Sequence, residues 1–539
     1  MRLKRDLSKS SLLFLSITSI VGSGWLFGSF YTSRIAGPAA VLSWIIGGLM
    51  IAVICLTLAE IVVMFARCAG TITFANVSHG KTTGAIFSWI TWLWTMGTVP
   101  LEVQAVIQYA STYISNLVHS GGHLTDLGLL VAVFLMFILS ALNMIGIKFL
   151  SSTNRFIVYW KIIIPIMMVA VFLCASSHYS NLTSHGFAPF GIEGVFSGIS
   201  TGGAAFSFFG FQAAAFLAGE SKSPQRAVPF ALFGSLFFCL VLYAALQLGF
   251  IVSLNPAALD NGGWAHISFE GDSGPFAAIL IGMGFFLLAK LLFIDAMVAP
   301  FGAGLGYVTS ASRILYSMGV HKEAPQFFSK LNRFSIPWVA IIVNFAFGMI
   351  IFLPFKGWHN IASFLAGIMI LSILCNPVCL LIFRKSLQHM KRPFYLPFAI
   401  PICLIAFFFC SLILYWCGWE VVSKIEFLFV LGVLVACIII LFKKDSSFFQ
   451  EIKNLNIFQS LWLFAYFICM GIISYFGSYG GGRGYLEGPY AYGTLFIMSI
   501  VIMYIAQKTA LTSEESVEIM EKAVQNVRDS DIDWASKSE

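Results

Sequence analysis

Long apolar segments separated by short polar stretches run through almost the whole chain. Each has about 18 or more residues, the length that an α-helix needs to cross roughly 30 Å of hydrocarbon. The eighth segment is long enough to begin with a helical portion outside the membrane. The pattern predicts fourteen membrane spans, at residues 12–32, 39–66, 85–117, 126–147, 156–175, 194–218, 227–252, 276–316, 336–354, 360–383, 397–417, 421–442, 460–477 and 490–506.

Composition agrees with this reading, because 59% of the 539 residues are hydrophobic and only 10% are charged. Soluble domains carry about 25% charged residues. The eleven cysteines show no metal-binding or redox spacing and most lie inside apolar segments, which predicts packing roles without a disulfide framework. The basic N-terminus followed by an apolar run resembles a signal peptide, but the run is long and lacks a convincing cleavage site, so we expect a retained first helix.

Loops that are rich in basic residues alternate along the chain with loops that hold few of them. Because basic loops stay in the cytoplasm, the alternation orients the spans and, with an even number, places both termini inside. The net charge of +7 therefore reflects topology, and we expect no nucleic-acid partner. The rich loops and the N-terminal tail hold Arg2, Lys4, Arg5, Lys9, Arg67, Lys81, Lys148, Arg155, Lys222, Arg226, Arg313, Lys322, Lys330, Arg333, Arg384, Lys385, Lys391, Arg392, Lys443, Lys444 and Lys453.

The first span is interrupted at its centre by Gly22, Ser23 and Gly24. Each glycine costs a helix roughly 1 kcal/mol relative to alanine, and a break in lipid frees backbone groups that something must satisfy. Transporters use such breaks to bind their substrates. A second interruption is expected at 206–212, in span six. Either cluster alone could serve close helix packing, but the two together favour one substrate site.

Span six is the fifth span after span one, and because five is an odd number it enters the membrane from the side opposite to span one. This is the requirement for two five-helix halves of inverted topology. We therefore predict an all-α polytopic membrane protein with an inverted five-plus-five helix repeat, broken helices 1 and 6, and four additional helices. The expected units are a cytoplasmic tail at 1–11, a transport core at 12–384, additional helices at 385–506 and a cytoplasmic tail at 507–539. In the last of these, Thr512–Glu515 predicts the start of a short amphipathic helix with Val517, Met520, Val524 and Val527 on one face.

An unwound helix centre presents groups of both polarities. The N–H groups of Ser23 and Gly24, at the start of the outer half-helix, suit a carboxylate. The carbonyls of Ile20 and Val21 suit an ammonium group, and span six adds carbonyls between Phe206 and Phe209, next to Gly210. A zwitterionic α-amino acid matches this arrangement, and Phe206 and Phe209 are candidates for closing over it.

Charged residues inside spans are functional candidates because burying each is costly. Lys161 lies in span five, about one turn from its predicted cytoplasmic end. It either snorkels to the surface or stands in for a bound sodium ion and titrates during transport.

Three acidic residues in predicted spans differ in their expected roles. Glu102 in span three and Asp295 in span eight lie deep and are coupling candidates, whereas Glu60, near the cytoplasmic end of span two, is expected to be structural. Lys290 lies five residues before Asp295, which places the two on different faces of one helix.

Motifs for zinc hydrolysis, nucleophilic serine chemistry, nucleotide binding and thiol redox chemistry are absent from the sequence. We therefore expect no enzyme activity, no metal and no cofactor other than the proton as coupling ion. Without a nucleotide-binding loop, uphill transport has to draw on an ion gradient.

Several motifs along residues 10–440 are jointly specific. They resemble the signatures of the amino acid–polyamine–organocation permeases. This resemblance implies the inverted-repeat (LeuT-like) fold, a substrate site between broken helices 1 and 6, and location in the cytoplasmic membrane of a bacterium. The motifs are Gly22-Ser23-Gly24 with Gly28, Phe209-Gly210-Phe211, residues 219–229, Ser312-Arg313-Ile314-Leu315-Tyr316, Pro325, Ile336-Pro337, Arg384, Lys391-Arg392-Pro393-Phe394 and Pro397.

The resemblance also bears on coupling. Lys161 matches a lysine of the proton-coupled members, which implies proton symport, and residues 99–105, 274–276 and 294–296 resemble the aspartate–proton symporter branch. Many members carry an acidic residue where this chain has Gln212. That departure weakens the case for arginine or polyamine substrates and leaves the coupling to Lys161, Glu102 or Asp295.

The leading hypothesis is a proton-coupled permease for aspartate or another small amino acid, with protons, the substrate and the lipid bilayer as its partners. An exchanger without net proton movement is the first alternative. A non-transporting membrane sensor is a remote one, because the C-terminal tail of about 30 residues is short for a signalling domain. The sequence does not specify the oligomeric state.

Overall fold

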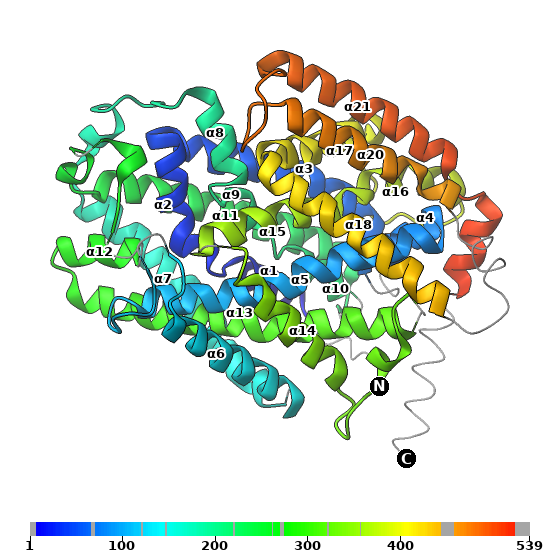
Figure 1. Ribbon diagram of the computed structural model, residues 1–539, viewed down its shortest axis with the longest axis horizontal. Coiled ribbons are helices and arrows are strands. Elements are labelled where there is room, and N and C mark those ends of the chain that lie inside the picture. The colour runs from blue at the N-terminus through cyan, green and yellow to red at the C-terminus, as the bar shows by residue number, and fades with distance from the viewer. Residues whose placement is uncertain are drawn as a thin grey trace.

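The computed structural model describes residues 7–65, 70–119, 122–145, 148–218, 221–260, 262–269, 274–320, 323–355, 357–442 and 457–522. Within these ranges the chain is all-α, with isolated β-bridges and no strand (Figure 1). Several residues used above lie outside the described ranges: Arg2, Lys4, Arg5, Arg67, Gly219, Glu220, Lys322, Lys443, Lys444, Lys453, Val524 and Val527.

Up to residue 253, the described residues form eleven α-helices. They are α1 (Lys9–Ile20), α2 (Gly24–Ala36), α3 (Ala40–Met64), α4 (Gly70–His79), α5 (Lys81–Ala110), α6 (Asp126–Ile145), α7 (Lys148–Ala175), α8 (Gly191–Ser200), α9 (Ala204–Phe208), α10 (Gln212–Phe216) and α11 (Pro224–Ser253).

The second half continues the same architecture after short 3₁₀ turns at Pro256–Leu259 and Trp264–His266. Its helices are α12 (Pro275–Gly282), α13 (Phe286–Val320), α14 (Trp338–Ile351), α15 (Gly357–Ile373), α16 (Cys375–Ser386), α17 (Ala399–Trp416), α18 (Trp419–Phe442), α20 (Ile457–Phe476) and α21 (Gly488–Thr509).

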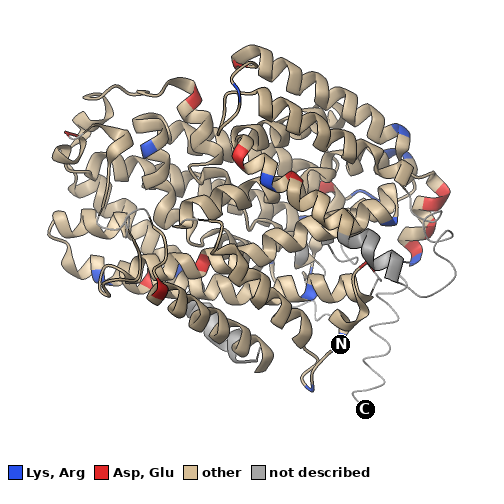
Figure 2. Cartoon of the chain, in the orientation of Figure 1, with Lys and Arg blue, Asp and Glu red and all other residues tan. Residues whose placement is uncertain are grey.

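Eight helical segments among the described residues are long and apolar enough to cross a membrane, and shorter apolar helices such as α1 and α14 accompany them. Figure 2 shows how sparse the charged residues are along these helices. The chain is therefore a multi-pass membrane protein. The count of fourteen spans and the inverted repeat stay predictions.

Two predicted boundaries near the third span are wrong. The helix α5 ends at Ala110, where 117 was expected, and turns follow it. The stretch expected to be a loop before it contains α4, because tertiary contacts hold this short helix in place. His79 Nε2 lies 3.0 Å from the Ala506 carbonyl of α21, and the Leu511 N–H donates to the Ser78 carbonyl at 3.0 Å.

The predicted eighth and tenth spans are each divided. A turn at Gly284, with φ +84°, separates the short α12 from the 35-residue α13, which accounts for the length of the eighth apolar segment. The tenth span consists of α15 and α16, which meet at Leu374.

An ion-paired cluster at Glu60 joins α3 to the loop between α16 and α17. The buried Glu60 carboxylate accepts from the Arg384 guanidinium at 2.6 and 3.0 Å and from the Leu396 N–H at 2.8 Å. Arg392 Nε lies 3.4 Å from Glu60 Oε1. These contacts fit the structural role expected of Glu60.

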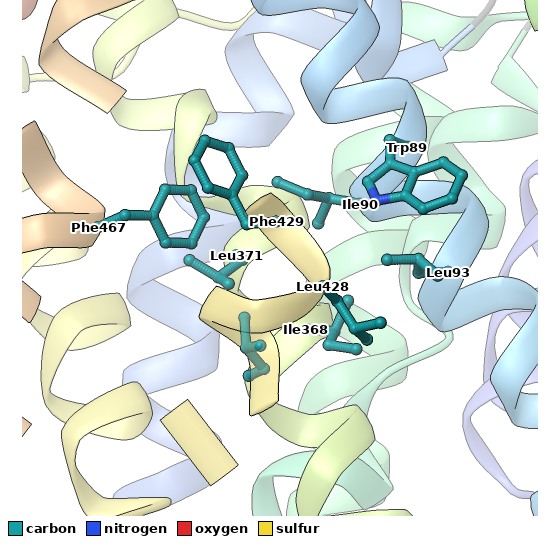
Figure 3. A pocket seen from close by; sticks show the side chains of 9 residues that line it. Trp89, Ile90, Leu93, Ile368, Leu371, Leu428, Phe429 and Phe467 are labelled. Carbon is teal, nitrogen blue, oxygen red and sulfur yellow. The ribbon is translucent and has the colours of Figure 1, made fainter. Parts of the chain in front are cut away.

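The last four long helices pack onto the rest of the bundle, with α17 against α3 and α18 against α15. Figure 1 shows α20 and α21 side by side at one edge. Where α5, α15, α18 and α20 meet, an apolar cavity of about 10 Å³ remains (Figure 3). That volume holds about one water molecule, so the cavity is a packing gap and no substrate site. Its lining consists of Trp89, Ile90, Leu93, Ile368, Leu371, Ile425, Leu428, Phe429 and Phe467.

A short helix follows α21 at 513–522, as the sequence predicts. Thr512 and Glu515 form a reciprocal capping box: the Thr512 N–H donates to the Glu515 carboxylate at 2.9 Å, and the Glu515 N–H donates to the Thr512 hydroxyl at 3.4 Å. Met520 packs into the core.

Candidate functional site

The first helix is interrupted where the glycines predict. Helix α1 ends at Ile20 and α2 begins at Gly24. Between them the Val21 N–H donates to the Ile17 carbonyl at 2.9 Å, and the Gly22 N–H donates to the Ile20 carbonyl at 3.0 Å. These two hydrogen bonds close a tight turn. Val21 and Ser23, which lie within the interruption, are fully buried.

The predicted sixth span has two interruptions, of which the sequence analysis identified one. The expected break falls between α9 and α10, where Phe209 is extended and Gly210 has φ +115°. An earlier break between α8 and α9 centres on Gly203, with φ +92°. The adjacent Gly202 and Gly203 were the available signal for it.

The broken segments of the two spans touch each other. A Cβ atom on Gly210 would overlap the Ser19 carbonyl and lie 2.8 Å from the Ile20 nitrogen. A Cβ atom on Gly24 would lie 2.9 Å from Ser207 Cβ. Since only glycine permits these approaches, the two breaks lie in direct contact; that they form one substrate site stays a prediction.

A carboxylate of the protein occupies the amide end of the first break. The Ser23 N–H donates to Glu102 Oε2 at 3.2 Å, and a Cβ atom on Gly22 would lie 3.0 Å from Glu102 Oε1. Glu102 is buried and lies at the N-terminus of α2, where the helix dipole favours negative charge. The sequence predicts that this N–H binds the substrate carboxylate, whereas in the structure α5 supplies a carboxylate there.

An ammonium group of the protein occupies the carbonyl end. Lys161 Nζ donates to the Thr18 carbonyl of α1 at 3.0 Å, and the side chain is 5% exposed. The snorkelling alternative is therefore wrong. Helix α7 begins at Lys148, so Lys161 lies roughly three and a half turns into the helix, while the apolar part of that helix begins at Tyr159.

Asp295 of α13 is the third buried charge at this site. Lys161 lies close enough to interact electrostatically with both Asp295 and Glu102. The Asp295 oxygens have no hydrogen bond of ordinary geometry among the described residues, and Trp160 is the donor that approaches them. Lys290 is exposed, so it lies on another face, as expected.

Aromatic side chains close the site on the side of α15. Trp358 Nε1 donates to the Ser23 hydroxyl at 2.9 Å, and its ring stacks on Phe27 with centroids 5.2 Å apart. Phe206 contacts the same indole edge-on at 5.9 Å. Phe209 instead packs on Phe211. The sequence analysis missed Trp358, whose only signal is its position beside a glycine at the start of a span.

Two further polar groups border the breaks. The Ile20 carbonyl, expected to bind a substrate ammonium group, accepts from the Tyr243 hydroxyl at 3.2 Å. Gln212 opens α10 and is 2% exposed, and its amide nitrogen has no hydrogen-bond partner within the described part of the chain. Its place at the second break is the one that the sequence predicts.

The described residues contain no group of three or more His, Cys, Asp or Glu side chains that could hold a metal ion. The site therefore consists of one buried lysine, two buried carboxylates and polarised backbone groups. Such a set can bind charges and hold or release protons.

Comparisons with known proteins show which proteins this chain resembles. The sequence pattern of a family described as amino acid permease matches residues 7–424. The glutamate/serine transporter AimA of Bacillus subtilis (strain 168) is 32% identical, over 95% of each chain. The aspartate-proton symporter of the same organism is 31% identical, over 94% of this chain and 97% of its own. A gamma-aminobutyric acid permease of that organism is 26% identical, over 65% of this chain and 72% of its own.

Proposed function

We propose that this chain, which belongs to the amino acid permease family, carries a small α-amino acid across the bacterial inner membrane together with protons. The two most similar relatives named above are a glutamate/serine transporter and an aspartate-proton symporter. Aspartate, glutamate and serine are therefore the first candidate substrates. On the proposed topology both termini are cytoplasmic.

The observation that carries the proposal is a pair of opposite charges at the two ends of one helix break. Lys161 donates to the carbonyl end of α1, and Glu102 accepts from the amide end of α2. A free α-amino acid carries the same two charges within one small molecule. A site that already accommodates a buried ammonium group and a buried carboxylate has the polarity that such a substrate requires.

Lys161 has the features of the coupling group. Its ammonium joins α7 to the end of α1, and the nearby Asp295 and Glu102 stabilise its charge. When Lys161 loses its proton, its hydrogen bond to the Thr18 carbonyl is no longer assisted by charge. Its electrostatic attraction to the carboxylates of Asp295 and Glu102 is lost as well. The packing of α7 on α1 then changes with protonation, which links proton binding to the conformation of the transporter.

Gln212 and Asp295 complete the proposed set of coupling and gating residues. Gln212 stands where a carboxylate would take up or release a proton, and an amide does neither. The proton therefore has to be exchanged among Lys161, Asp295 and Glu102.

The decisive experiment measures uptake of radiolabelled aspartate, glutamate and serine into proteoliposomes with and without an inward proton gradient. We expect accumulation driven by the gradient in the wild type and its loss in Lys161→Ala. Lys290→Ala is the matched control, because that lysine is exposed on another face of α13. It should accumulate substrate like the wild type.

Two outcomes would contradict the proposal in different ways. Counterflow that is insensitive to the gradient would exclude symport and establish the exchanger. Gradient-driven accumulation that persists in Lys161→Ala would move the coupling away from this lysine.

A further inference from the structure

We propose that Glu102 is an internal competitor of the substrate, whose carboxylate holds the Ser23 N–H until a proton neutralises it. This inference rests on the proposed function, since it assigns Ser23 to the carboxylate of an amino acid substrate. It adds an order of events: the proton binds to Glu102 first, and the substrate carboxylate then takes its place.

The Glu102 carboxylate already binds the Ser23 N–H that a substrate carboxylate would use. Glu102 Oε2 lies 3.2 Å from the Ser23 nitrogen, and Oε1 lies close over Gly22. The Ser23 hydroxyl is already the acceptor of the Trp358 N–H at 2.9 Å. A substrate carboxylate at the start of α2 would therefore meet an ionised carboxylate at the same N–H, and like charges at one site repel each other strongly.

Protonation resolves this conflict. A neutral carboxyl group loses the charge-assisted hydrogen bond, which is roughly twice as strong as a neutral one. It also loses its attraction to the helix dipole. The Ser23 N–H then becomes available, and the substrate supplies the negative charge that Glu102 has given up.

The groups that face Glu102 are consistent with a proton exchange at this carboxylate. They are the Ser23 N–H from the break, Lys161 of α7, Tyr243 of α11 and Tyr307 of α13. Lys161 favours the ionised form of Glu102, and the two phenols carry no charge at physiological pH. Lys161 is also bound to Thr18 and interacts with Asp295, so it does not depend on Glu102 alone.

The sign of the pH dependence follows from this exchange. Lowering the pH protonates Glu102, frees the Ser23 N–H and strengthens substrate binding. Raising the pH restores the carboxylate and weakens binding. On the proposed topology, substrate would bind on the more acidic outer side and leave on the inner side, where Glu102 returns to Ser23.

The test measures binding of radiolabelled aspartate to the purified full-length protein at about pH 5.5 and about pH 8, on either side of neutrality. In the wild type the dissociation constant should be lower at the acidic pH. Glu102→Gln imitates the protonated residue, so it should bind about tenfold or more tightly than the wild type at the alkaline pH, with little pH dependence. If the contact between Glu102 and Ser23 only stabilised the structure, its removal in Glu102→Gln would weaken substrate binding.

Proton uptake provides a second and direct measurement. Adding substrate to the weakly buffered wild-type protein near neutral pH should withdraw protons from solution, because binding requires a neutral Glu102. In Glu102→Gln this uptake should disappear. A pH indicator dye in the solution records the difference.

Two variants separate competition from other effects. Asp295→Asn also removes a buried negative charge that interacts with Lys161, but Asp295 does not hydrogen-bond to Ser23. It should not raise the affinity. Glu102→Asp keeps the charge but draws it back from Ser23, so it should bind more tightly than the wild type at the alkaline pH and take up fewer protons on binding.

The outcomes distinguish this inference from the proposed function. Weaker or unchanged binding by Glu102→Gln at the alkaline pH, in protein that elutes and melts like the wild type, would overturn the competition. Proton uptake that persists in Glu102→Gln would overturn it as well. By contrast, tighter binding by Glu102→Gln together with wild-type uptake that ignores the proton gradient would overturn symport and leave the competition standing.

Discussion

At the scale of single residues, glycine decides where the two broken helices meet. Gly210 lies with φ +115° against the peptide that joins Ser19 to Ile20. The sequence identifies this residue because a glycine within an apolar segment weakens the helix there. Its contact with the first break follows only from the fold.

We expect Gly210→Ala to abolish substrate accumulation. An alanine there would be strained at this φ and would clash with the backbone of Ser19 and Ile20, which cannot move as a flexible side chain does. Proteoliposome uptake, with protein quantity and melting temperature recorded in parallel, measures the effect. Gly282→Ala, at a position with open space around it, is the control and should transport normally.

The same scale shows the limit of prediction from sequence at this site. Lys161, Glu102 and Asp295 stand out because each is a charge in an apolar segment. Their partners Ser23 and Thr18 depend on how α5 and α7 are rotated about their axes. Spacing along one chain does not specify that rotation, because packing of several helices sets it.

At the scale of elements, short segments held by tertiary contacts escaped prediction. The ten-residue α4 is too short for a span and owes its place to packing against α5 and α16 and to the contact of His79 with the Ala506 carbonyl of α21. Helix α5 also ends earlier than expected, at Ala110; in the turns that follow, Leu117 is buried, whereas Tyr113 and Ile114 are exposed. The length of an apolar segment predicts the long helices well, but it does not predict the residues at which they end.

The ion-paired cluster at Glu60 joins separate elements of the fold, and we expect its removal to lower the stability of the folded protein. Glu60→Ala would leave Arg384 and Arg392 without their carboxylate and the Leu396 N–H without its acceptor. Breaking a buried ion pair costs about 3–5 kcal/mol, somewhat less here because both arginines are partly exposed. We expect a clearly lower melting temperature in detergent.

The control for this prediction is an ion pair of the C-terminal helix. Lys522 hydrogen-bonds to Glu518 and lowers the pKa of that carboxyl, but both side chains are exposed. Exposed pairs contribute little to stability. Glu518→Ala should therefore melt like the wild type, and an equal loss in both variants would contradict the role assigned to Glu60.

At the scale of the whole molecule, the distribution of charge predicts the topology. Basic residues gather in alternate loops, and the positive-inside rule turns that alternation into an orientation. The all-α bundle and its membrane-length helices follow from hydrophobicity alone. The number of spans depends on whether divided segments such as α8–α10 and α15–α16 are each counted as one span. The count of fourteen spans therefore stays a prediction.

Labelling with a membrane-impermeant maleimide in intact cells tests this topology. The background replaces the exposed Cys174 by serine, and new cysteines are introduced singly at His185 and at Glu514, both exposed. With fourteen spans and both termini inside, His185→Cys lies in the loop after span five and should react in intact cells. Glu514→Cys should react only after permeabilisation. Labelling of Glu514→Cys from outside would require an odd number of spans, whereas protection of both positions would place the loop after span five in the cytoplasm and reverse the first half of the chain.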